Sequence, residues 1–372
     1  MLLLPSKLRG GSMRQRKVVF LVLIVSLLVA TRSHAETDTC SQFLQQYDYD
    51  NVIKECTRQI AGVVKTPNMA LSYLHRGIAY EAKDQFDLAI ADFDKAIKMN
   101  PNYAEAYNNR GNTYLLKGQP DQAIVDFDKA IKLKPTYERA YFNRGQAELA
   151  KNQFDKAIAD YSKVIEIKPD LPRAYLYQVY FYRGVAYGSS EKFDQAIADF
   201  SKAIEINPNS EKAYDSRGNI YLLKGQADQA IADYSKVIAL NPKNLQAYNN
   251  RALAFQSKRQ FDQAVADYSK IIELNPKIAQ AYFYRGIVYA LQAKQDQAIA
   301  DFKKTIELNP KESSGYYNLA CIYSVKKNVK DSCAWLERAV ANGYDKWDSM
   351  KKDPDLVNIR DSACYQKIMK DK

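Results

Sequence analysis

The chain has 372 residues, of which 47% are hydrophobic, 12% are aromatic and 26% are charged. This composition excludes an intrinsically disordered chain, because it provides enough apolar side chains to bury a large core. The formal net charge of +11 raises the question of a nucleic-acid or membrane partner, so the position of the charges has to be examined first.

The N-terminal segment carries much of the excess positive charge. Residues 1–35 contain six basic side chains and no acidic one, and Val18 to Ala30 form an apolar run without charge. A basic segment, a short apolar run and a small residue at Ala35 predict a secretory signal peptide, since a spanning helix needs about 20 apolar residues. We expect cleavage after Ala35 and export to the periplasm or the extracellular space. If the signal stays uncleaved, residues 18–30 would anchor the protein to the inner membrane, which is the one membrane contact we expect.

The charge that remains is spread along the chain in both signs. Without residues 1–35 there are 48 basic and 43 acidic side chains, which leaves a net charge of +5. A mixed surface of this kind is typical of a solvated protein and lacks the basic stripe that follows a phosphate backbone. We therefore expect no nucleic-acid partner.

A period of about 34 residues, a length typical of stacked helix pairs, runs through the rest of the chain. Prolines recur at this constant interval, with one longer interval between the third and the fourth; they are Pro101, Pro135, Pro169, Pro208, Pro242, Pro276 and Pro310. Within one unit, Tyr107, Gly111 and Tyr114 recur at helical spacing, and Phe127 and Ala130 do so after a turn. The period predicts a stack of antiparallel helix pairs.

This framework resembles that of the tetratricopeptide repeat family. The family's aromatic, small and proline positions are met by Tyr107, Gly111, Tyr114, Ala123, Phe127, Ala130 and Pro135. The resemblance covers residues 70–342, with units that start near residues 70, 104, 138, 172, 211, 245, 279 and 313. It implies an all-α fold, a right-handed α-solenoid of about eight helix hairpins, whose concave groove holds a protein or peptide. A degenerate N-terminal repeat over residues 36–69 and a C-terminal helical cap over 343–372 are expected to cover the ends, because an apolar end face would otherwise meet water.

An arginine at the seventh position of a unit recurs with an aspartate sixteen residues later. The pairs are Arg76 and Asp92, Arg110 and Asp126, Arg144 and Asp160, Arg183 and Asp199, Arg217 and Asp233, Arg251 and Asp267, and Arg285 and Asp301. In the eighth unit both are replaced together, by Leu319 and Trp335. We expect a structural ion pair across each hairpin, because a buried arginine without its carboxylate is costly. The alternative is that the arginines reach a ligand.

The resemblance also implies which side chains line the groove. The expected peptide-binding amides are Asn109, Asn143, Asn250 and Asn318 at the sixth position, with Asn108, Asn112, Asn219 and Asn249 beside them. An amide donates and accepts hydrogen bonds, which suits an extended main chain. Apolar pockets between the amides are expected from Phe142, Phe181, Tyr182, Phe283, Tyr284 and Tyr317. The alternative is that the asparagines are simply solvated helix positions.

One unit departs from the period. The longer interval, between Pro169 and Pro208, reflects five extra residues near Ala174 to Gly184. Five residues turn a helix by about 500°, so we expect either a first helix lengthened at its start, near Pro172, or a bulge. Either would expose Tyr175, Tyr177 and Tyr180. These tyrosines would form a binding cluster if the insertion is functional, and the alternative is that the insertion arose by neutral slippage.

The five cysteines permit disulfides if the protein is exported. Cys40 and Cys56 fall on facing helices of the degenerate repeat, and we expect them to be bonded. At the other end we favour Cys333 with Cys364, which would tie the C-terminal tail to the last hairpin and leave Cys321 buried. Cys321 with Cys333 is the alternative pairing.

No catalytic constellation is present in the sequence. His34 and His75 are the only histidines, and the chain lacks GxSxG, HExxH, GxGxxG and P-loop motifs. We expect no enzyme, no cofactor, no metal site and no small-molecule substrate. The predicted function is an exported bacterial scaffold or adaptor that binds an extended protein segment and supports assembly of a cell-envelope or secreted complex. A membrane-anchored assembly factor and a glycan- or peptidoglycan-binding module are the alternatives.

Overall fold

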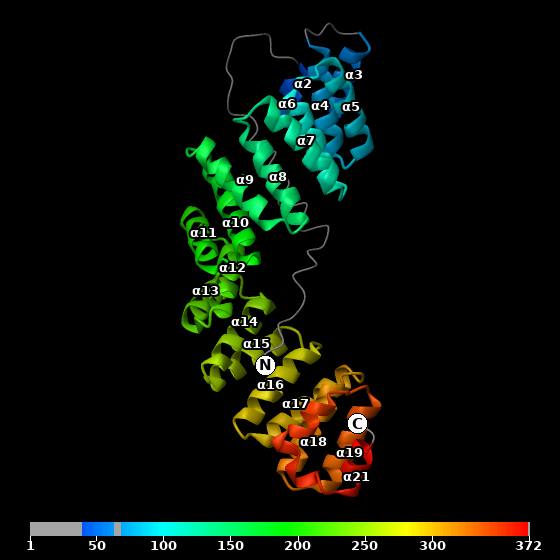
Figure 1. Cartoon of the computed structure of the whole chain (residues 1–372), viewed down its shortest axis with the longest axis vertical. Helices are drawn as coiled ribbons and strands as arrows, with labels where there is room; N and C mark the ends of the chain where they lie inside the picture. The colour runs from blue at the N-terminus through cyan, green and yellow to red at the C-terminus, as the bar shows by residue number, and fades with distance from the viewer. Residues whose placement is uncertain (1–38, 63–67, 371–372) are drawn as a thin grey trace. The chain divides into compact units, whose positions relative to one another are not determined.

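The computed structural model describes residues 39–62 and 68–370, so the predicted signal peptide lies outside the described residues. Within those ranges helices are the only regular secondary structure, as the all-α prediction requires. The chain divides between Pro208 and Asn209 into two compact units, which are described separately below. Figure 1 follows the helices from blue to green through the first unit and from green to red through the second.

The first unit contains ten described helices. They are α2 (Thr39–Gln45), α3 (Tyr49–Ile60), α4 (Met69–Ala82), α5 (Phe86–Met99), α6 (Ala104–Leu116), α7 (Pro120–Leu133), α8 (Glu138–Ala150), α9 (Phe154–Ile167), α10 (Arg173–Ser189) and α11 (Phe193–Ile206). Consecutive helices pack as hairpins, α2 with α3, α4 with α5 and so on. The first helices of neighbouring hairpins also contact one another, whereas the second helices do so less. We therefore call the first helix of each hairpin the inner helix and the second the outer helix.

The second unit repeats this arrangement and ends in short helices. Its hairpins are formed by α12 (Glu211–Leu223) and α13 (Ala227–Leu240), α14 (Leu245–Ser257) and α15 (Phe261–Leu274), α16 (Ala279–Leu291) and α17 (Gln295–Leu308), and α18 (Ser313–Val325) and α19 (Val329–Ala341). The 3₁₀ helix η2 (Pro354–Ile359) follows α20 (Trp347–Lys352) and precedes α21 (Ala363–Met369). Both units are thus stacks of helix hairpins, as expected for an α-solenoid.

The two helices of a hairpin approach closely where a glycine faces an aromatic ring. A Cβ added at Gly111 would lie 2.8 Å from the ring of Phe127, which is fully buried. The hairpin α2–α3 places Cys40 and Cys56 at the two corresponding positions, again sixteen residues apart, and joins them by a disulfide. The covalent bond therefore replaces the glycine–ring contact in this short terminal hairpin.

The turn inside each hairpin needs one residue in the left-handed backbone region. Glycine occupies it at Gly118 and Gly225, with φ of 76° and 73°. Other residues adopt the same conformation with φ from 57° to 60°; they are Asp84, Asn152, Glu191, Arg259, Ala293 and Lys327. Because a Cβ is unfavourable in this region, these positions carry a local energetic cost.

We expect Ala293→Gly to raise the free energy of unfolding of the second unit by about 0.5–1 kcal/mol, since glycine relieves the left-handed strain at the cost of some unfolded-state entropy. Urea unfolding followed by circular dichroism measures this change. Gly225→Ala is the matched control and should shift the midpoint in the opposite direction, because its added Cβ meets no atom within 4 Å and acts through the backbone alone. An unchanged or lower midpoint for Ala293→Gly would contradict the interpretation.

The extra residues lengthen an inner helix at its start. Helix α10 has 17 residues and begins at Arg173, whereas α6, α8 and α12 have 13. The expected exposed cluster is wrong for Tyr175, which is only 6% exposed because its ring packs against Phe142 at a centroid distance of 5.1 Å. Tyr177 and Tyr180 are half-buried rather than exposed. The insertion therefore enlarges the core of the first unit.

The C-terminal segment covers the last hairpin of the second unit. Met350, Leu356 and Ile359 are fully buried in one core cluster with residues of α18 and α19. The segment also makes polar contacts with α18, since the Tyr317 hydroxyl donates to Asp353 at 2.5 Å. The disulfide between Cys333 and Cys364 joins α19 to α21, while Cys321 is buried and unbonded to another cysteine.

Candidate binding face of the inner helices

The seven arginines at the seventh position bind their own hairpins. In α6, Arg110 donates through Nε and Nη2 to the two carboxylate oxygens of Asp126, at 2.8 and 2.7 Å. All seven pairs show this two-bond arrangement, with distances between 2.6 and 2.9 Å. The hydrogen bonds to Asp126 raise the pKa of the Arg110 guanidinium above its ordinary value. Two of the three guanidinium nitrogens are therefore already bonded within the hairpin.

The remaining guanidinium nitrogen reaches the preceding hairpin. Nη1 of Arg144 donates to Asp128 at 2.5 Å, and Nη1 of Arg251 donates to Ser235 at 2.9 Å. The guanidinium of Arg251 also lies 5.7 Å from the ring centroids of Tyr248 and Phe255. The arginine thus joins two successive hairpins as well as the two helices of its own hairpin, which the sequence did not predict.

Four of the expected groove amides bond to one another, in two pairs, between inner helices. Asn108 is 4% exposed and accepts from Nδ2 of Asn143 at 3.0 Å. Asn219 accepts from Nδ2 of Asn250 at 3.1 Å and from the Tyr234 hydroxyl at 2.8 Å. The expectation that Asn108, Asn219 and Asn250 serve a ligand is therefore corrected, because they are largely buried or already bonded and connect neighbouring inner helices.

Three further amides are also engaged inside the chain. Nδ2 of Asn112 donates to Glu81 at 2.9 Å, and burial raises the pKa of Glu81 to about 7. Nδ2 of Asn318 donates to the carbonyl of Ser314 in its own helix at 2.8 Å. Asn249 donates to its neighbour Asn250 at 3.3 Å. A ligand would find at most the second N–H and the carbonyl oxygen of each of these side chains.

The expected aromatic pockets divide into buried and half-buried rings. Phe142 is 1% exposed and lies in the core, with its ring centroid 5.6 Å from Tyr161. Tyr317 is covered by the C-terminal segment and stacks on Tyr344 at 4.1 Å. The expectation that these two rings line pockets is corrected. Phe181, Tyr182, Phe283 and Tyr284 are half-buried.

Asn109 and Asn143 are the expected amides that keep hydrogen-bonding capacity at equivalent positions of consecutive inner helices. They occupy the same position in the consecutive inner helices α6 and α8, and both are half-buried. Within the described part of the chain, the Asn109 side chain makes no hydrogen bond, and Asn143 uses only Nδ2. On the next inner helix, α10, Tyr182 follows at the equivalent position. We call Asn109, Asn143 and Tyr182 the inner-face site.

Models of the tetratricopeptide repeat match residues 104–137, 138–171, 177–210, 245–278 and 279–312, and a further one matches 200–232. A TPR repeat model matches residues 77–118 and 218–258. Together these matches cover more than half of the 372 residues. The chain belongs to the tetratricopeptide repeat family.

Several solved structures resemble this one. The C-terminal part of a TPR repeat-containing protein from Cytophaga hutchinsonii has a TM-score of 0.54 and 22% identity, over 65% of this chain and 96% of that chain. MamA has a TM-score of 0.42 and 29% identity, over 46% of this chain and 96% of that chain. YrrB, described as a TPR protein with an unusual peptide-binding site, has a TM-score of 0.45 and 22% identity, over 51% of this chain and 95% of that chain. A comparison with curated protein sequences found no match.

The TPR array makes this protein a protein–protein interaction scaffold, a class that is typically non-catalytic. The match over residues 177–210 begins five residues after position 172, so the extra residues precede the part of that repeat that the family model matches. In residues 39–62 and 68–370, no three side chains of histidine, cysteine, aspartate or glutamate are grouped to hold a metal ion. Over the same ranges, none of the helices is sufficiently long and apolar to span a bilayer.

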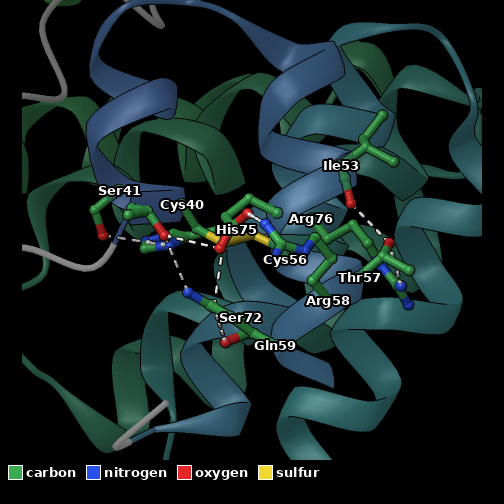
Figure 2. Close-up of a disulfide and its surroundings, with 12 residues drawn as sticks. Cys40, Ser41, Ile53, Cys56, Thr57, Arg58, Gln59, Ser72, His75 and Arg76 are labelled. Carbon is green, nitrogen blue, oxygen red and sulfur yellow. Dashed lines mark hydrogen bonds and ion pairs between the residues drawn. A yellow bond between two sulfur atoms is a disulfide. The ribbon is translucent and has the colours of Figure 1, made fainter. Parts of the chain in front are cut away.

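The hairpin α2–α3 packs on the next inner helix, α4, at the N-terminal end of the described residues. Figure 2 shows the Cys40–Cys56 disulfide beside His75, whose Nδ1 lies 3.4 Å from the Ser41 hydroxyl. Gln59 accepts a hydrogen bond from Ser72 at 2.7 Å, so α3 and α4 are also joined. His75 occupies the position in α4 that Asn109 occupies in α6, and it is buried at 9% exposure.

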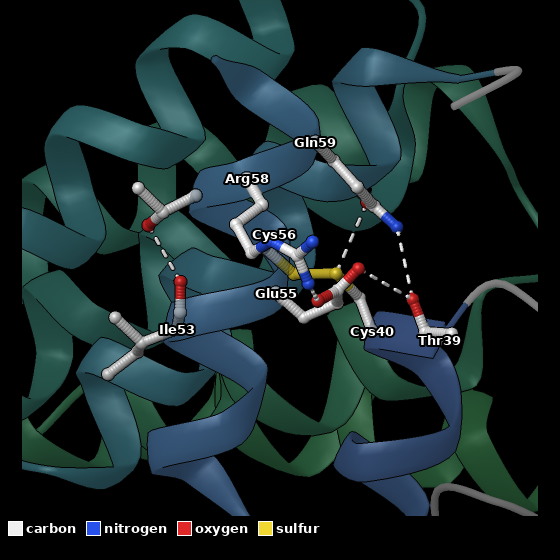
Figure 3. A network of polar contacts seen from close by, with 8 residues as sticks. Thr39, Cys40, Ile53, Glu55, Cys56, Arg58 and Gln59 are labelled. Carbon is white, nitrogen blue, oxygen red and sulfur yellow. Dashed lines mark hydrogen bonds and ion pairs between the residues drawn. A yellow bond between two sulfur atoms is a disulfide. The ribbon is translucent and has the colours of Figure 1, made fainter. Parts of the chain in front are cut away.

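A second set of contacts holds α2 against α3 on the other side of this disulfide. The Thr39 hydroxyl donates to Glu55 at 3.2 Å, and Glu55 also accepts from Arg58 at 2.9 Å (Figure 3). These contacts are exposed and contribute little on their own. The disulfide is therefore the main tether of α2.

Proposed function

We propose that this TPR protein is an exported scaffold that binds an extended segment of another protein on the inner helices of its first unit. In this proposal it supports assembly of a cell-envelope or secreted complex. The observation that carries the proposal is the pair Asn109 and Asn143, whose amides keep unused donors or acceptors on consecutive inner helices.

The inner-face site combines two kinds of recognition. A peptide main chain in extended conformation presents N–H and C=O groups, and a side-chain amide can satisfy both. Beyond the amides, helix α10 presents half-buried rings, and those of Tyr177 and Phe181 stack at a centroid distance of 5.9 Å. The proposed segment is held by its main chain at α6 and α8 and places an apolar side chain against α10.

Two features support export. The first is the predicted signal peptide, and the second is the pair of disulfides, Cys40–Cys56 and Cys333–Cys364. Disulfides persist in oxidising compartments and are rare in the reducing cytosol. The disulfides are consistent with a periplasmic or extracellular location.

We expect Asn109→Ala/Asn143→Ala to weaken partner binding by about 10- to 100-fold, because loss of two hydrogen bonds is worth about 1–3 kcal/mol. Residues 36–372 serve as bait for affinity capture from envelope extract, followed by titration of the captured protein. N-terminal sequencing of the full-length chain after expression and purification tests export separately, because the mature chain begins at Glu36 if the signal is cleaved after Ala35.

The matched control is Gln122→Ala/Gln195→Ala, which removes two exposed amides from the outer helices α7 and α11 of the same unit. It should bind as the unchanged protein does and retain the melting temperature. The inner-helix variant should melt at a lower temperature, because Asn143→Ala leaves the buried Asn108 without its donor, so binding is compared at a temperature at which both variants are folded. If the inner-helix variant holds the same partner with unchanged affinity, the inner-face site is not the binding site. Loss of the partner on addition of peptidoglycan fragments would favour the glycan-binding alternative.

A further inference from the structure

Glu148 occupies a position in α8 at which the other inner helices of the repeats carry an aromatic residue. The equivalent residues are Tyr80, Tyr114, Tyr187, Tyr221, Phe255, Tyr289 and Tyr323. In five of those helices the ring lies against the arginine four residues earlier, with distances of 5.7–5.8 Å from the guanidinium carbon to the ring centroid. In α8 the corresponding arginine is Arg144, and a carboxyl group stands in place of the ring.

The carboxyl group of Glu148 is buried without a donor. The residue is 5% exposed, and within the described residues its Oε2 has no hydrogen-bond partner. A buried ionised carboxylate is costly unless it is paired, whereas a protonated one can donate. Protonated Glu148 can donate a hydrogen bond to the carboxylate of Asp160 in α9.

Glu148 is surrounded by charged groups from α9 and α7, the two helices that pack most extensively on α8. They are Asp160 and Lys156 from α9 and Asp128 from α7, in addition to Arg144 from α8 itself. The phenol of Tyr161 in α9 is a further titratable neighbour. Helix α10 contributes the phenol of Tyr182, which contacts Gln146, and α6 meets α8 through the uncharged Asn108.

We propose that Glu148 is a proton-controlled joint between the hairpins α6–α7 and α8–α9. Protonated Glu148 donates to Asp160 and leaves Arg144 to bind Asp160 and Asp128, which holds the two hairpins together. Ionised Glu148 adds a third carboxylate beside Asp160 and Asp128, repels both, and competes for Arg144. The hairpins then separate more often.

The direction of the pH effect follows from the burial of the acid. Burial, and secondarily the charge of Asp160, raise the pKa of Glu148 from 4.5 to about 7. The packed state therefore holds the proton more tightly than the opened state, so opening is least favoured below pH 4.5. Opening becomes more favoured as the pH rises from 4.5 to 7, and the effect is complete above pH 7.

Hydrogen exchange of the full mature chain, read by mass spectrometry at pH 6 and pH 8 and corrected for the intrinsic rates, tests the proposal. We expect the opening equilibrium of the amides in α8 and α9 to rise about tenfold over this interval. In Glu148→Gln, which cannot ionise, and in Glu148→Tyr, which restores the residue type of the other hairpins, the rise should be less than about twofold.

The amides of α14 and α15 in the same spectra are the internal control, because Phe255 occupies the equivalent position there. Glu81 in α4 also has its pKa raised to about 7, so the comparison is between variants and not only between pH values. If Glu148→Gln disturbs folding, Glu148→Tyr carries the test. A tenfold rise that persists in the folded variant, or no rise in the unchanged protein, would overturn the proposal.

Discussion

Replacing Asp267 by alanine should lower the free energy of unfolding of the second unit by about 3 kcal/mol. Asp267 is 4% exposed and accepts both hydrogen bonds that Arg251 makes within its hairpin, at 2.8 and 2.6 Å. Without the aspartate, the guanidinium keeps only Ser235 and the flanking rings. A largely buried cation then lacks its counter-charge, which is the costly half of a broken ion pair. Urea unfolding of the second unit, followed by its tryptophan fluorescence, measures the loss.

Two variants separate this effect from loss of surface charge. Lys270→Ala removes one partner of the exposed Lys270–Glu273 pair in the same helix, and we expect it to cost less than about 0.5 kcal/mol. Arg251→Leu/Asp267→Ala removes both charges, as the last hairpin does with Leu319 and Trp335, and should lose less stability than Asp267→Ala alone. A double variant less stable than the single one would show that burial of the uncompensated arginine is not the cause.

Removing the Cys40–Cys56 disulfide should lower the stability of the terminal hairpin by about 3 kcal/mol, as expected for a closed loop of this length. The bond spans 16 residues, and α2 has only seven residues with which to bury its apolar face. Cys40→Ala/Cys56→Ala should therefore lose hydrogen-exchange protection across residues 39–60. Protection in α6 and α7 should change little, because hairpins of a solenoid interact mainly with their neighbours.

Cys321→Ala is the control for the loss of cysteine as such. Cys321 is buried and forms no disulfide, so its replacement should leave residues 39–60 fully protected. If the Cys40→Ala/Cys56→Ala protein retains its protection at these residues, non-covalent contacts such as those of Gln59 hold the hairpin. The disulfide would then be dispensable for the N-terminal end of the inner face.

The position of the arginines was accessible to sequence reasoning because each arginine and its aspartate lie in one hairpin of fixed length. Arg110 and Asp126 recur at the same spacing as the other pairs, so local geometry suffices to bring them together. The contact of Arg144 with Asp128 is of a different kind, because it depends on how one hairpin packs on the next. Spacing alone does not distinguish Asp128 from other exposed acids of α7.

The inner-face site was only partly predictable for the same reason. All the asparagines named from the sequence fall on inner helices, but Asn108 and Asn250 are bonded to side chains of the neighbouring inner helix, far away along the chain. Whether an amide is free depends on the neighbouring helix, and helical periodicity carries no information on that. Glu148 is recognisable in the sequence as a carboxylate at a position where the other repeats have an aromatic residue. Only the structure shows that its oxygen Oε2 is buried without a hydrogen-bond partner, which is the basis for a role in pH dependence.

By itself the sequence determined the TPR period, the helix hairpins and the arginine–aspartate pairs. These features depend on residues that are close along the chain or at a constant spacing, so each repeat provides the same information again. Only the tertiary structure decided that Phe142 and Tyr175 are core, that the tail covers Tyr317, and that Asn109 and Asn143 keep free capacity. Those outcomes depend on which helix faces which, because burial and hydrogen bonding are properties of the contact between helices and not of either helix alone.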